Sequence, residues 1–370
     1  MAEEGVARTQ ALRVAVVGAG AFGRNHLRVL RELEQAGQAV ELVAVVDRDS
    51  AAVAAASEKF GVPGFETIEA CLAAVGRLDA ASVCVPTVHH ASAAAPLLAA
   101  GVDLLIEKPL AASLADADLI LDLARKHGRV VQVGHLERFN PAVTAAREHL
   151  HKPMFFEAHR LSIFTPRSLD VDVVLDLMIH DLDIVLSLVA SPVREVRAVG
   201  LPVLSRKVDI ANVRVEFENG CIANFTASRV STERVRKLRF FQPHQYLSLD
   251  FARQDLLMID VTAAAGMDPA MLAAMAEKAQ QAGAQLGGHP SAGLSLKKVS
   301  VELGEPLRLE IEAFLRAVRE RTRPLVSGRM GALRLLWRSR SMRRLQGMRS
   351  GRGCRTLCNC RISCDAGFSG

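Results

Sequence analysis

A segment that is otherwise apolar carries five titratable residues. It is VDVVLDLMIHDLDIVLSLV, from Val171 to Val189, and it holds Asp172, Asp176, His180, Asp181 and Asp183. On a helix that advances about 100° per residue, all of these except Asp181 fall within about 80° of one another. A helix that is apolar over the rest of its surface is normally buried, so the polar stripe indicates either a narrow wet edge or a reactive site.

Within that stripe, His180 and Asp176 have the types and spacing of a base and its orienting carboxylate. They are four residues apart, which is about one helical turn. A neutral imidazole titrates near physiological pH and can take the proton of a hydroxyl group. His180 is therefore a candidate for proton-transfer chemistry, with a plain solvent-facing edge as the alternative.

A second constellation has the spacing of a dinucleotide-binding loop, G-x-G-x-x-G, between an apolar run and an amphipathic one. Its members are Gly18, Gly20, Ala21, Phe22 and Gly23. The first glycine permits a tight turn, the second admits a pyrophosphate and the third allows close packing of helix and strand. Asp47 ends the next apolar run and can accept hydrogen bonds from an adenosine ribose, which favours NAD. Arg48 beside it leaves NADP as an alternative.

Polar residues also follow three other apolar runs, at the end of a strand where ligands bind in open α/β sheets. The motif LLIEKP contains Glu107 and Lys108 directly after its apolar residues, and a lysine there can contact a nicotinamide or remain at the surface. The remaining candidates for cofactor and substrate contacts are Pro86, Thr87 and His90 in one run, and His135, Arg138 and Asn140 in the other.

These residues require a sheet that brings strand ends together. Residues 1–135 alternate strand-like and helix-like segments, which predicts an α/β domain with a doubly wound parallel sheet of the Rossmann type. Residues 136–327 carry mostly strand-like runs with few helices, which predicts an α+β domain with a mostly antiparallel open sheet. Residues 328–370 form an atypical Arg- and Cys-rich tail, either a disordered basic extension or the product of a shifted reading frame.

Composition restricts the class of protein. Ten of the 46 basic residues and only one of the 40 acidic residues lie from Gly328 onward, so the chain before it holds 36 basic and 39 acidic residues. That body predicts no nucleic-acid groove. No run approaches the ~20 apolar residues of a membrane span, and the polar start lacks a signal sequence, so we expect a cytoplasmic protein. The tail cysteines match no usual metal spacing, and no metal site is expected.

The glycine motif, EKP after a strand, GHLERFNP and D-x-x-x-H-x-x-D together resemble the glucose–fructose oxidoreductase/inositol dehydrogenase (Gfo/Idh/MocA) family over residues 12–328. Within it, RSLDVDVVLDLMIHDLDI and FFQPHQYLSLDF are most similar to the branch that oxidises the 3-hydroxyl of UDP-N-acetylglucosamine with NAD. The resemblance implies that the 3-keto product passes to an aminotransferase for lipid A synthesis. It also implies a homodimer or homotetramer.

The resemblance further implies that Lys108, Asp176 and His180 meet at the nicotinamide and the sugar. Either His180 or Lys108 then serves as the base, and the other stabilises the developing alkoxide. Arg160 and Arg167 precede the Asp176 helix and are candidates for the substrate diphosphate, with a structural role as the alternative. Two other functions remain open: a free-sugar or inositol dehydrogenase, and a non-catalytic sensor protein that keeps the dinucleotide fold.

Overall fold

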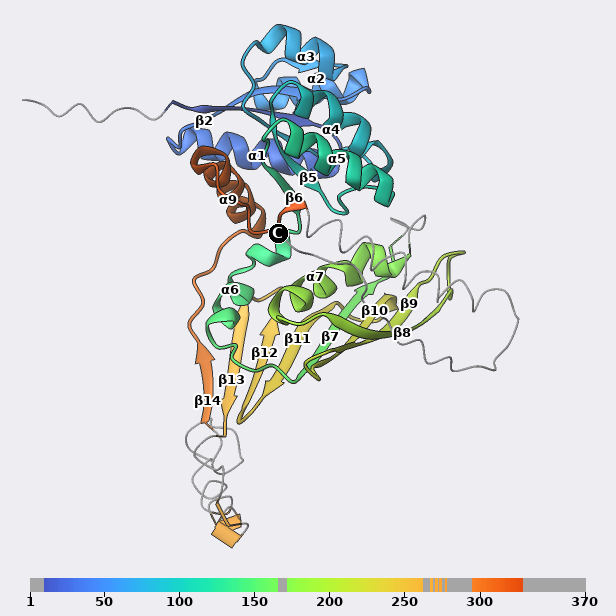
Figure 1. The fold of residues 1–370 in the computed structure, drawn as a ribbon, viewed down its shortest axis with the longest axis vertical. Helices are drawn as coiled ribbons and strands as arrows, with labels where there is room; N and C mark the ends of the chain where they lie inside the picture. Colours follow the sequence, from blue (N-terminus) through green and yellow to red (C-terminus); the bar gives the residue numbers. More distant parts are fainter. Residues whose placement is uncertain are drawn as a thin grey trace, which may run out of the picture. The chain divides into compact units, whose positions relative to one another are not determined.

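The computed structural model describes residues 10–165, 172–261, a few positions between 267 and 277, and 295–328. The chain divides into two compact units, which Figure 1 shows as ribbons. Residues up to Phe139 and the segment that begins at Glu305 form the first unit, and residues 140–304 belong to the second. Arg167 and the tail after Gly328 lie outside the described residues. Within the described part, no helix is long and apolar enough to cross a membrane.

The first unit contains a six-stranded parallel sheet with the order β3-β2-β1-β4-β5-β6. Its strands are short runs rich in Val, Leu, Ile and Ala, as expected for a sheet buried on both faces. They are β1 (Leu12–Val17), β2 (Val40–Val46), β3 (Gly64–Phe65), β4 (Ala80–Val83), β5 (Asp103–Glu107) and β6 (Val131–Gly134). This order is that of a doubly wound dinucleotide-binding sheet, so the predicted fold class is confirmed for this unit.

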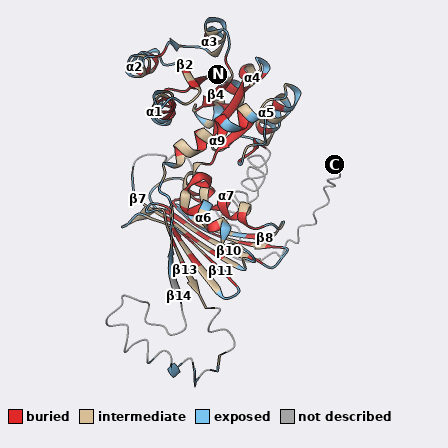
Figure 2. Ribbon diagram, turned by 90° about the vertical axis from the view of Figure 1, so that its left-hand side faces the viewer, coloured by how far each residue is buried: buried red, intermediate tan, exposed pale blue. Residues whose placement is uncertain are grey.

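Helices cover both faces of that sheet. They are α1 (Ala21–Gln35), α2 (Ser50–Phe60), α3 (Ile68–Val75), α4 (His90–Ala99), α5 (Leu114–Lys126) and α9 (Pro306–Glu320), with the 3-10 turns η1 (Thr87–His89) and η2 (Leu136–Phe139). One apolar cluster lies under α4 and α5, and a second joins α1 and α9 to the other face. The central strands that these helices cover are buried and appear in red in Figure 2.

Helix α9 belongs to the first unit although it follows the whole second unit in sequence. Its apolar residues Leu307, Ile311, Phe314 and Leu315 are buried in one cluster with residues of β1 and α1. The sequence predicts a second domain that extends to residue 327, whereas the segment that begins at Glu305 packs with the first unit. Nothing in an amphipathic pattern says which sheet a helix will cover, so this assignment emerges only from the packing.

The second unit contains an eight-stranded sheet with the order β14-β13-β12-β11-β7-β10-β9-β8. Only the pair formed by β7 and β10 is parallel, and the other pairs are antiparallel. The strands are β7 (Phe155–Ile163), β8 (Val193–Leu201), β9 (Ile210–Phe217), β10 (Ile222–Ser231), β11 (Val235–Gln242), β12 (Gln245–Asp250), β13 (Asp255–Asp260) and β14 (Ser295–Val299). Helices α6 (Pro141–Glu148) and α7 (Ile179–Leu188) lie over one face (Figure 1).

The segment with the titratable stripe is not a uniform α-helix. It begins with a π-helical stretch, η3 (Val174–Met178), and continues without a break as α7. Asp176 lies in the π-helical part and His180 in the first turn of α7. π-Helical turns are rare in proteins overall, and those that occur often lie at functional sites. Here the π-helical turn contains Asp176 and lies next to His180, the two residues singled out by their chemistry.

Candidate active site

The glycine loop of the first unit has the conformation that a dinucleotide requires. Gly18 has a φ of 106°, and a Cβ built there would lie 2.7 Å from the carbonyl carbon and oxygen of Cys84. A Cβ on Gly23 would overlap the carbonyl oxygen of Gly18. Both positions therefore need glycine for the fold itself, because the turn and the approach of α1 to the loop leave no room for a side chain.

Gly20 differs from these two glycines. Its φ of −64° suits any residue, and a Cβ there would meet no protein atom within 4 Å. It stands immediately before the first residue of α1, next to the exposed Ala21 and Phe22. The space above Gly20 at the amino end of α1 fits a pyrophosphate, which the backbone N–H groups and the helix dipole would hold.

Asp47 links the end of β2 to this loop. One of its carboxylate oxygens accepts a hydrogen bond from the backbone N–H of Ala19 at 2.7 Å, and the other accepts one from the N–H of Asp49 at 3.0 Å. Each oxygen retains a second lone pair that a ribose hydroxyl can use. The carboxylate is thus held in place before a nucleotide binds.

A cavity of about 330 Å³ opens beside Asp47 at the carboxyl ends of β1, β2 and β4. Of the predicted cofactor residues, it is lined by Asp47, Arg48 and Pro86. Sequence reasoning missed its other polar lining residues, which are Glu66, Thr67, Glu69, His89 and Ser92. Glu66 and Glu69 follow a strand of only two residues, which left no periodic signal. Three carboxylates around one arginine make the cavity unfavourable for a 2′-phosphate and favour NAD.

His90 does not point into this cavity. Its ring is buried, with Nδ1 at 3.0 Å from the Pro109 carbonyl oxygen and Nε2 at 2.9 Å from that of Val85. Burial lowers the pKa of His90, against the opposing effect of these carbonyl groups. His90 therefore holds the loop after β4 against the loop after β5, and its neighbour His89 is the one that lines the cavity. Thr87 begins the η1 turn, which ends at His89, and it is half-buried.

Lys108 follows the last residue of β5, and its peptide bond to Pro109 is cis. In the observed strand order, β5 and β6 lie on the side of β1 opposite to β2, the strand that ends at Asp47. A dinucleotide that places its adenosine in the cavity beside Asp47 and crosses the glycine loop would extend its nicotinamide toward the ends of β5 and β6. Glu107, by contrast, is buried and contacts His26 of α1, with 3.1 Å between Oε1 and Nε2.

The GHLERFNP motif that follows β6 is mostly buried. His135 and Arg138 are both buried, and the backbone N–H of Arg138 donates to the His135 carbonyl. Asn140 caps α6 by accepting from the N–H of Ala142 at 3.1 Å, and it donates to the Phe251 carbonyl at 3.1 Å. Asn140 thereby joins a helix end to the β12–β13 turn, which is a structural task.

In the second unit, Asp176 and His180 are half-buried, whereas the other acids of the segment are buried. Asp172 accepts from the backbone N–H of Val208 at 2.8 Å. Asp183 is electrostatically coupled to Arg147 of α6, whose pKa is lowered by burial. The stripe expected from the sequence is therefore divided, and its two partly accessible members are those proposed for proton transfer.

Arg160 and Asp181 form a buried pair. Nε and Nη2 of Arg160 donate to the two carboxylate oxygens at 2.9 and 2.8 Å, and the guanidinium lies over the ring of Phe251, 5.2 Å from its centroid. Asp181 lies on the apolar side in the helical projection, and its charge is neutralised by Arg160 of β7. This pairing joins Arg160 of β7 to Asp181 of α7 and gives Arg160 a structural role in the second unit.

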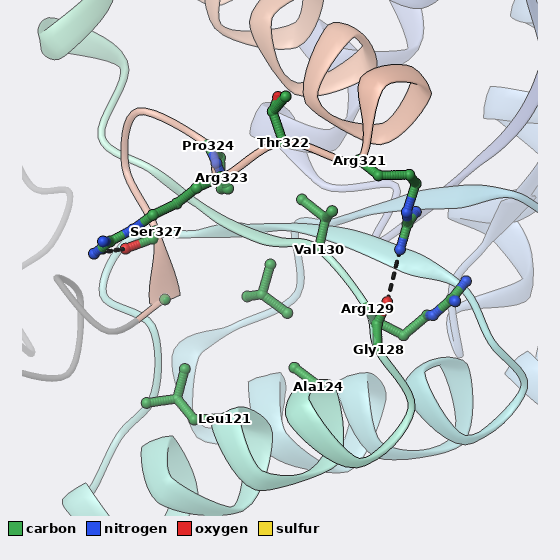
Figure 3. Close-up of a pocket in the computed structure, with 12 residues that line it drawn as sticks. Leu121, Ala124, Gly128, Arg129, Val130, Arg321, Thr322, Arg323, Pro324 and Ser327 are labelled. Atoms are coloured by element: carbon green, nitrogen blue, oxygen red, sulfur yellow. Dashed lines mark hydrogen bonds between the residues drawn. The ribbon is translucent and has the colours of Figure 1, made fainter. Parts of the chain in front are cut away.

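A larger cavity of about 460 Å³ lies elsewhere in the first unit, between α5 and the segment after α9. Figure 3 shows its lining, with Arg321 donating to the Gly128 carbonyl at 2.7 Å. It adjoins Val131 at the amino end of β6, whereas ligands of this fold bind at the carboxyl ends of strands. It is therefore set apart from the cofactor residues. Across the described residues, no group of three His, Cys, Asp or Glu could hold a metal ion.

Comparison with known families matches both halves of the described chain. Residues 12–135 match the oxidoreductase family with an NAD-binding Rossmann fold, and residues 142–242 match the GFO/IDH/MocA C-terminal domain. The chain belongs to the Gfo/Idh/MocA oxidoreductase family. The predicted family, enzyme class and cofactor are confirmed: this member is an NAD-dependent oxidoreductase.

Particular members of the family are similar to this chain to different extents. The UDP-N-acetylglucosamine 3-dehydrogenase of Acidithiobacillus ferrooxidans is 37% identical over 246 residues, which cover 66% of this chain and 76% of that protein. A solved structure of that enzyme superposes with a TM-score of 0.79 at 31% identity, covering 92% of this chain and 99% of the other. The inositol 2-dehydrogenase of Corynebacterium glutamicum is 34% identical over 142 residues, only 38% of this chain and 41% of that protein.

Proposed function

We propose that this Gfo/Idh/MocA member oxidises the 3-hydroxyl of UDP-N-acetylglucosamine with NAD and releases the 3-keto nucleotide sugar. The observation that carries the proposal is the similarity to the Acidithiobacillus ferrooxidans 3-dehydrogenase, which spans 76% of that protein. The alignment of 246 residues is longer than the dinucleotide-binding half of the chain, so the likeness includes part of the domain that distinguishes substrates.

We assign the chemistry to Lys108, Asp176 and His180. When bound, NAD supplies the hydride acceptor. His180 takes the hydroxyl proton, Asp176 orients its ring, and the Lys108 ammonium stabilises the alkoxide as it forms. The roles of His180 and Lys108 can be exchanged, because either group can act as the base. The half-buried state of Asp176 and His180 supports this assignment, since a catalytic pair needs both shelter and access.

For the substrate, we propose contacts from His135 and Arg138, which follow β6, and from Arg167, which lies outside the described residues. Arg167 remains our candidate for the diphosphate, because a guanidinium binds phosphate with two parallel hydrogen bonds. We propose that Asn140 and Arg160 contribute indirectly, through the helix cap and the Asp181 pair described above.

The product determines what must follow it. A 3-keto sugar nucleotide is the substrate that an aminotransferase converts into a 3-amino sugar, so we propose that this enzyme precedes such a step in lipid A synthesis. We also propose a cytoplasmic homodimer or homotetramer. The eight-stranded sheet supports the oligomer, because its strands carry exposed apolar residues such as Val199, Leu201 and Phe241.

The test is an assay in which the purified protein is incubated with NAD and each member of a panel of UDP-sugars and free polyols. The formation of NADH is monitored by its absorbance. We expect UDP-N-acetylglucosamine to be used and free N-acetylglucosamine to be used far less, because binding energy from the nucleotide positions the reacting carbon. Reduction of NAD by myo-inositol or glucose alone would support the second candidate function, a free-polyol dehydrogenase, which the inositol 2-dehydrogenase similarity favours. NAD binding without turnover of any substrate would indicate a sensor protein.

A further inference from the structure

The residue before Lys108 is held by a buried contact that the proposed chemistry does not use. Glu107 ends β5, and its Oε1 lies 3.1 Å from Nε2 of His26. The His26 side chain is fully buried in α1, three residues beyond the last glycine of the dinucleotide loop. With a carboxylate as partner, the ring N–H donates and the carboxylate accepts.

On its other side, Glu107 is enclosed by β6. In the parallel register, Gly134 is the residue opposite Glu107. A Cβ on Gly134 would lie 2.7 Å from Oε1 of Glu107 and 2.9 Å from its Cδ, which is too close for the carboxylate to keep its position. Gly134 is not among the glycines with a positive φ, so its lack of a side chain serves the close approach of Glu107, whose carboxylate is nearest and whose Cα would lie 3.1 Å from that Cβ, and not an unusual backbone conformation.

The same contact reaches the cofactor loop. The ring of Phe22, in the first turn of α1, is tilted against the His26 imidazole with 5.4 Å between centroids. Phe22 is 36% exposed beside the open space above Gly20. The series Phe22, His26, Glu107 therefore runs from the edge of the pyrophosphate cradle to the residue bonded to Lys108.

We propose that His26, Glu107 and Gly134 form a positioning unit that sets the location of the Lys108 amine. The inference rests on the proposed function, in which Lys108 acts on the substrate hydroxyl. None of the three needs to touch the substrate. They act because Glu107 and Lys108 share a backbone, so a shift of the buried carboxylate displaces the amine. A misplacement of about 1 Å at a reacting group can cost about 100-fold in rate.

Paired variants separate positioning from general damage. His26→Leu removes the donor, whereas His26→Gln keeps an N–H group that can reach the carboxylate. Gly134→Ala moves Glu107 without changing any polar group. Asp103→Asn is the matched control: it alters another buried carboxylate at the opposite end of the same strand, where Asp103 pairs with Arg321.

With NAD and UDP-N-acetylglucosamine, we expect kcat to fall about 10- to 100-fold in His26→Leu and Gly134→Ala, with KM for NAD changed less than about twofold. His26→Gln and Asp103→Asn are expected to keep kcat near wild type. If His26→Leu and Gly134→Ala retain kcat while Lys108→Ala abolishes turnover, the positioning unit is refuted and the proposed function stands. If Lys108→Ala itself retains turnover, the proposed function fails first.

A second measurement does not depend on activity. The amine of Lys108 in the full-length protein is acylated with acetic anhydride, and the rate is followed by peptide mass spectrometry, with Lys59 of α2 as internal reference. We expect the Lys108 rate to change several-fold in His26→Leu and Gly134→Ala and to stay at the wild-type value in Asp103→Asn. An unchanged Lys108 rate in both test variants overturns the inference, even if a variant lowers turnover for another reason.

Discussion

The backbone N–H of Ala19 donates to the Asp47 carboxylate at 2.7 Å, so the acid that follows β2 holds the loop that follows β1. Asp47 thus serves the loop and, in our account, the ribose. Removal of the hydrogen bonds to the Ala19 N–H and to the ribose should weaken NAD binding by about 1.5–3 kcal/mol, which is about 10- to 100-fold in KM for NAD. Asp47→Ala should show this increase with little change in kcat. Equal NAD affinity in that variant would mean that Asp47 is not the ribose acceptor.

The glycine loop provides a sharper contrast. Gly20→Ala adds a methyl group where no protein atom lies within 4 Å, so the fold should lose at most about 1 kcal/mol, the range of a helix N-cap change. The same methyl group should obstruct the pyrophosphate and raise KM for NAD at least about tenfold, or ~1.4 kcal/mol. NAD titration and thermal unfolding measure the two effects. Full NAD affinity in Gly20→Ala would contradict the cradle.

The matched variant of that loop is Gly23→Ala, in which the added Cβ overlaps the Gly18 carbonyl oxygen. We expect it to destabilise the first unit by about 1–3 kcal/mol or more, as overpacking does. A Gly23→Ala protein that unfolds at the wild-type temperature would show that α1 can move away from the loop at little cost.

Lys108→Ala and His180→Ala should lower turnover by about 100- to 10,000-fold, the range for loss of an acid–base group. Neither residue belongs to the glycine loop or lines the Asp47 cavity, so NAD binding should stay within about twofold, less than ~0.5 kcal/mol. Isothermal titration with NAD and steady-state kinetics distinguish the two quantities. Turnover within a few-fold of wild type in either variant would remove that residue from the catalytic set.

The Arg160–Asp181 pair gives a stability prediction for the second unit. Arg160→Met leaves a buried carboxylate without its partner and should destabilise the protein by about 3–5 kcal/mol, measured by denaturant unfolding. The double variant Arg160→Met, Asp181→Leu removes both charges and should recover much of that loss. If the double variant is stable but has lost affinity for the UDP moiety, Arg160 binds the diphosphate after all.

Asp209 gives a pH prediction. Burial tends to raise its pKa, but the Ser205 hydroxyl and the backbone N–H groups of Ser205, Val203 and Leu204 outweigh this and lower the pKa to about 2. A carboxyl group with a depressed folded-state pKa stabilises the protein above its unfolded pKa, near 3.9, and this contribution is lost as the pH falls toward 2.

Asp209→Asn should therefore lose about 1–3 kcal/mol at neutral pH and show a flatter decline of unfolding free energy below pH 4. Chemical denaturation at a series of pH values tests this. The loop that Asp209 organises continues to Val208, which bonds Asp172 at the start of the His180 segment. Parallel stability curves for the two proteins would show that Asp209 is not the group being titrated.

Local signals account for what the sequence could predict. The strand, glycine turn, helix and acid around Gly18 and Asp47 are close in the chain, and each has a strong positional preference, so that part of the fold was predictable. The run around Phe155–Ile163 likewise alternates in sequence as a strand does, and the structure forms β7 there. What lies far apart in sequence left no such signal, and α9 could not be assigned to the first unit from its amphipathic pattern.

The site shows the same division. A helical projection grouped Asp172, Asp176, His180 and Asp183 because it uses spacing alone. It could not detect the π-helical turn at Val174–Met178. It also could not show that Asp172 and Asp183 are buried in the folded chain. Pairs such as Arg160–Asp181 and His26–Glu107 join residues 21 and 81 positions apart. Only the folded chain brings them together, so the sequence could not show that Arg160 and Glu107 have buried partners.

The central claim is that hydride leaves C3 of UDP-N-acetylglucosamine for NAD. It is tested most directly by supplying that substrate with deuterium at C3, together with NAD, a sugar-nucleotide aminotransferase and an amino donor that draw the unfavourable oxidation forward. We predict that NADH recovered from the reaction carries the deuterium and that a UDP-3-amino sugar accumulates. Unlabelled NADH alongside oxidised sugar would show that another carbon is oxidised, and would contradict the assignment.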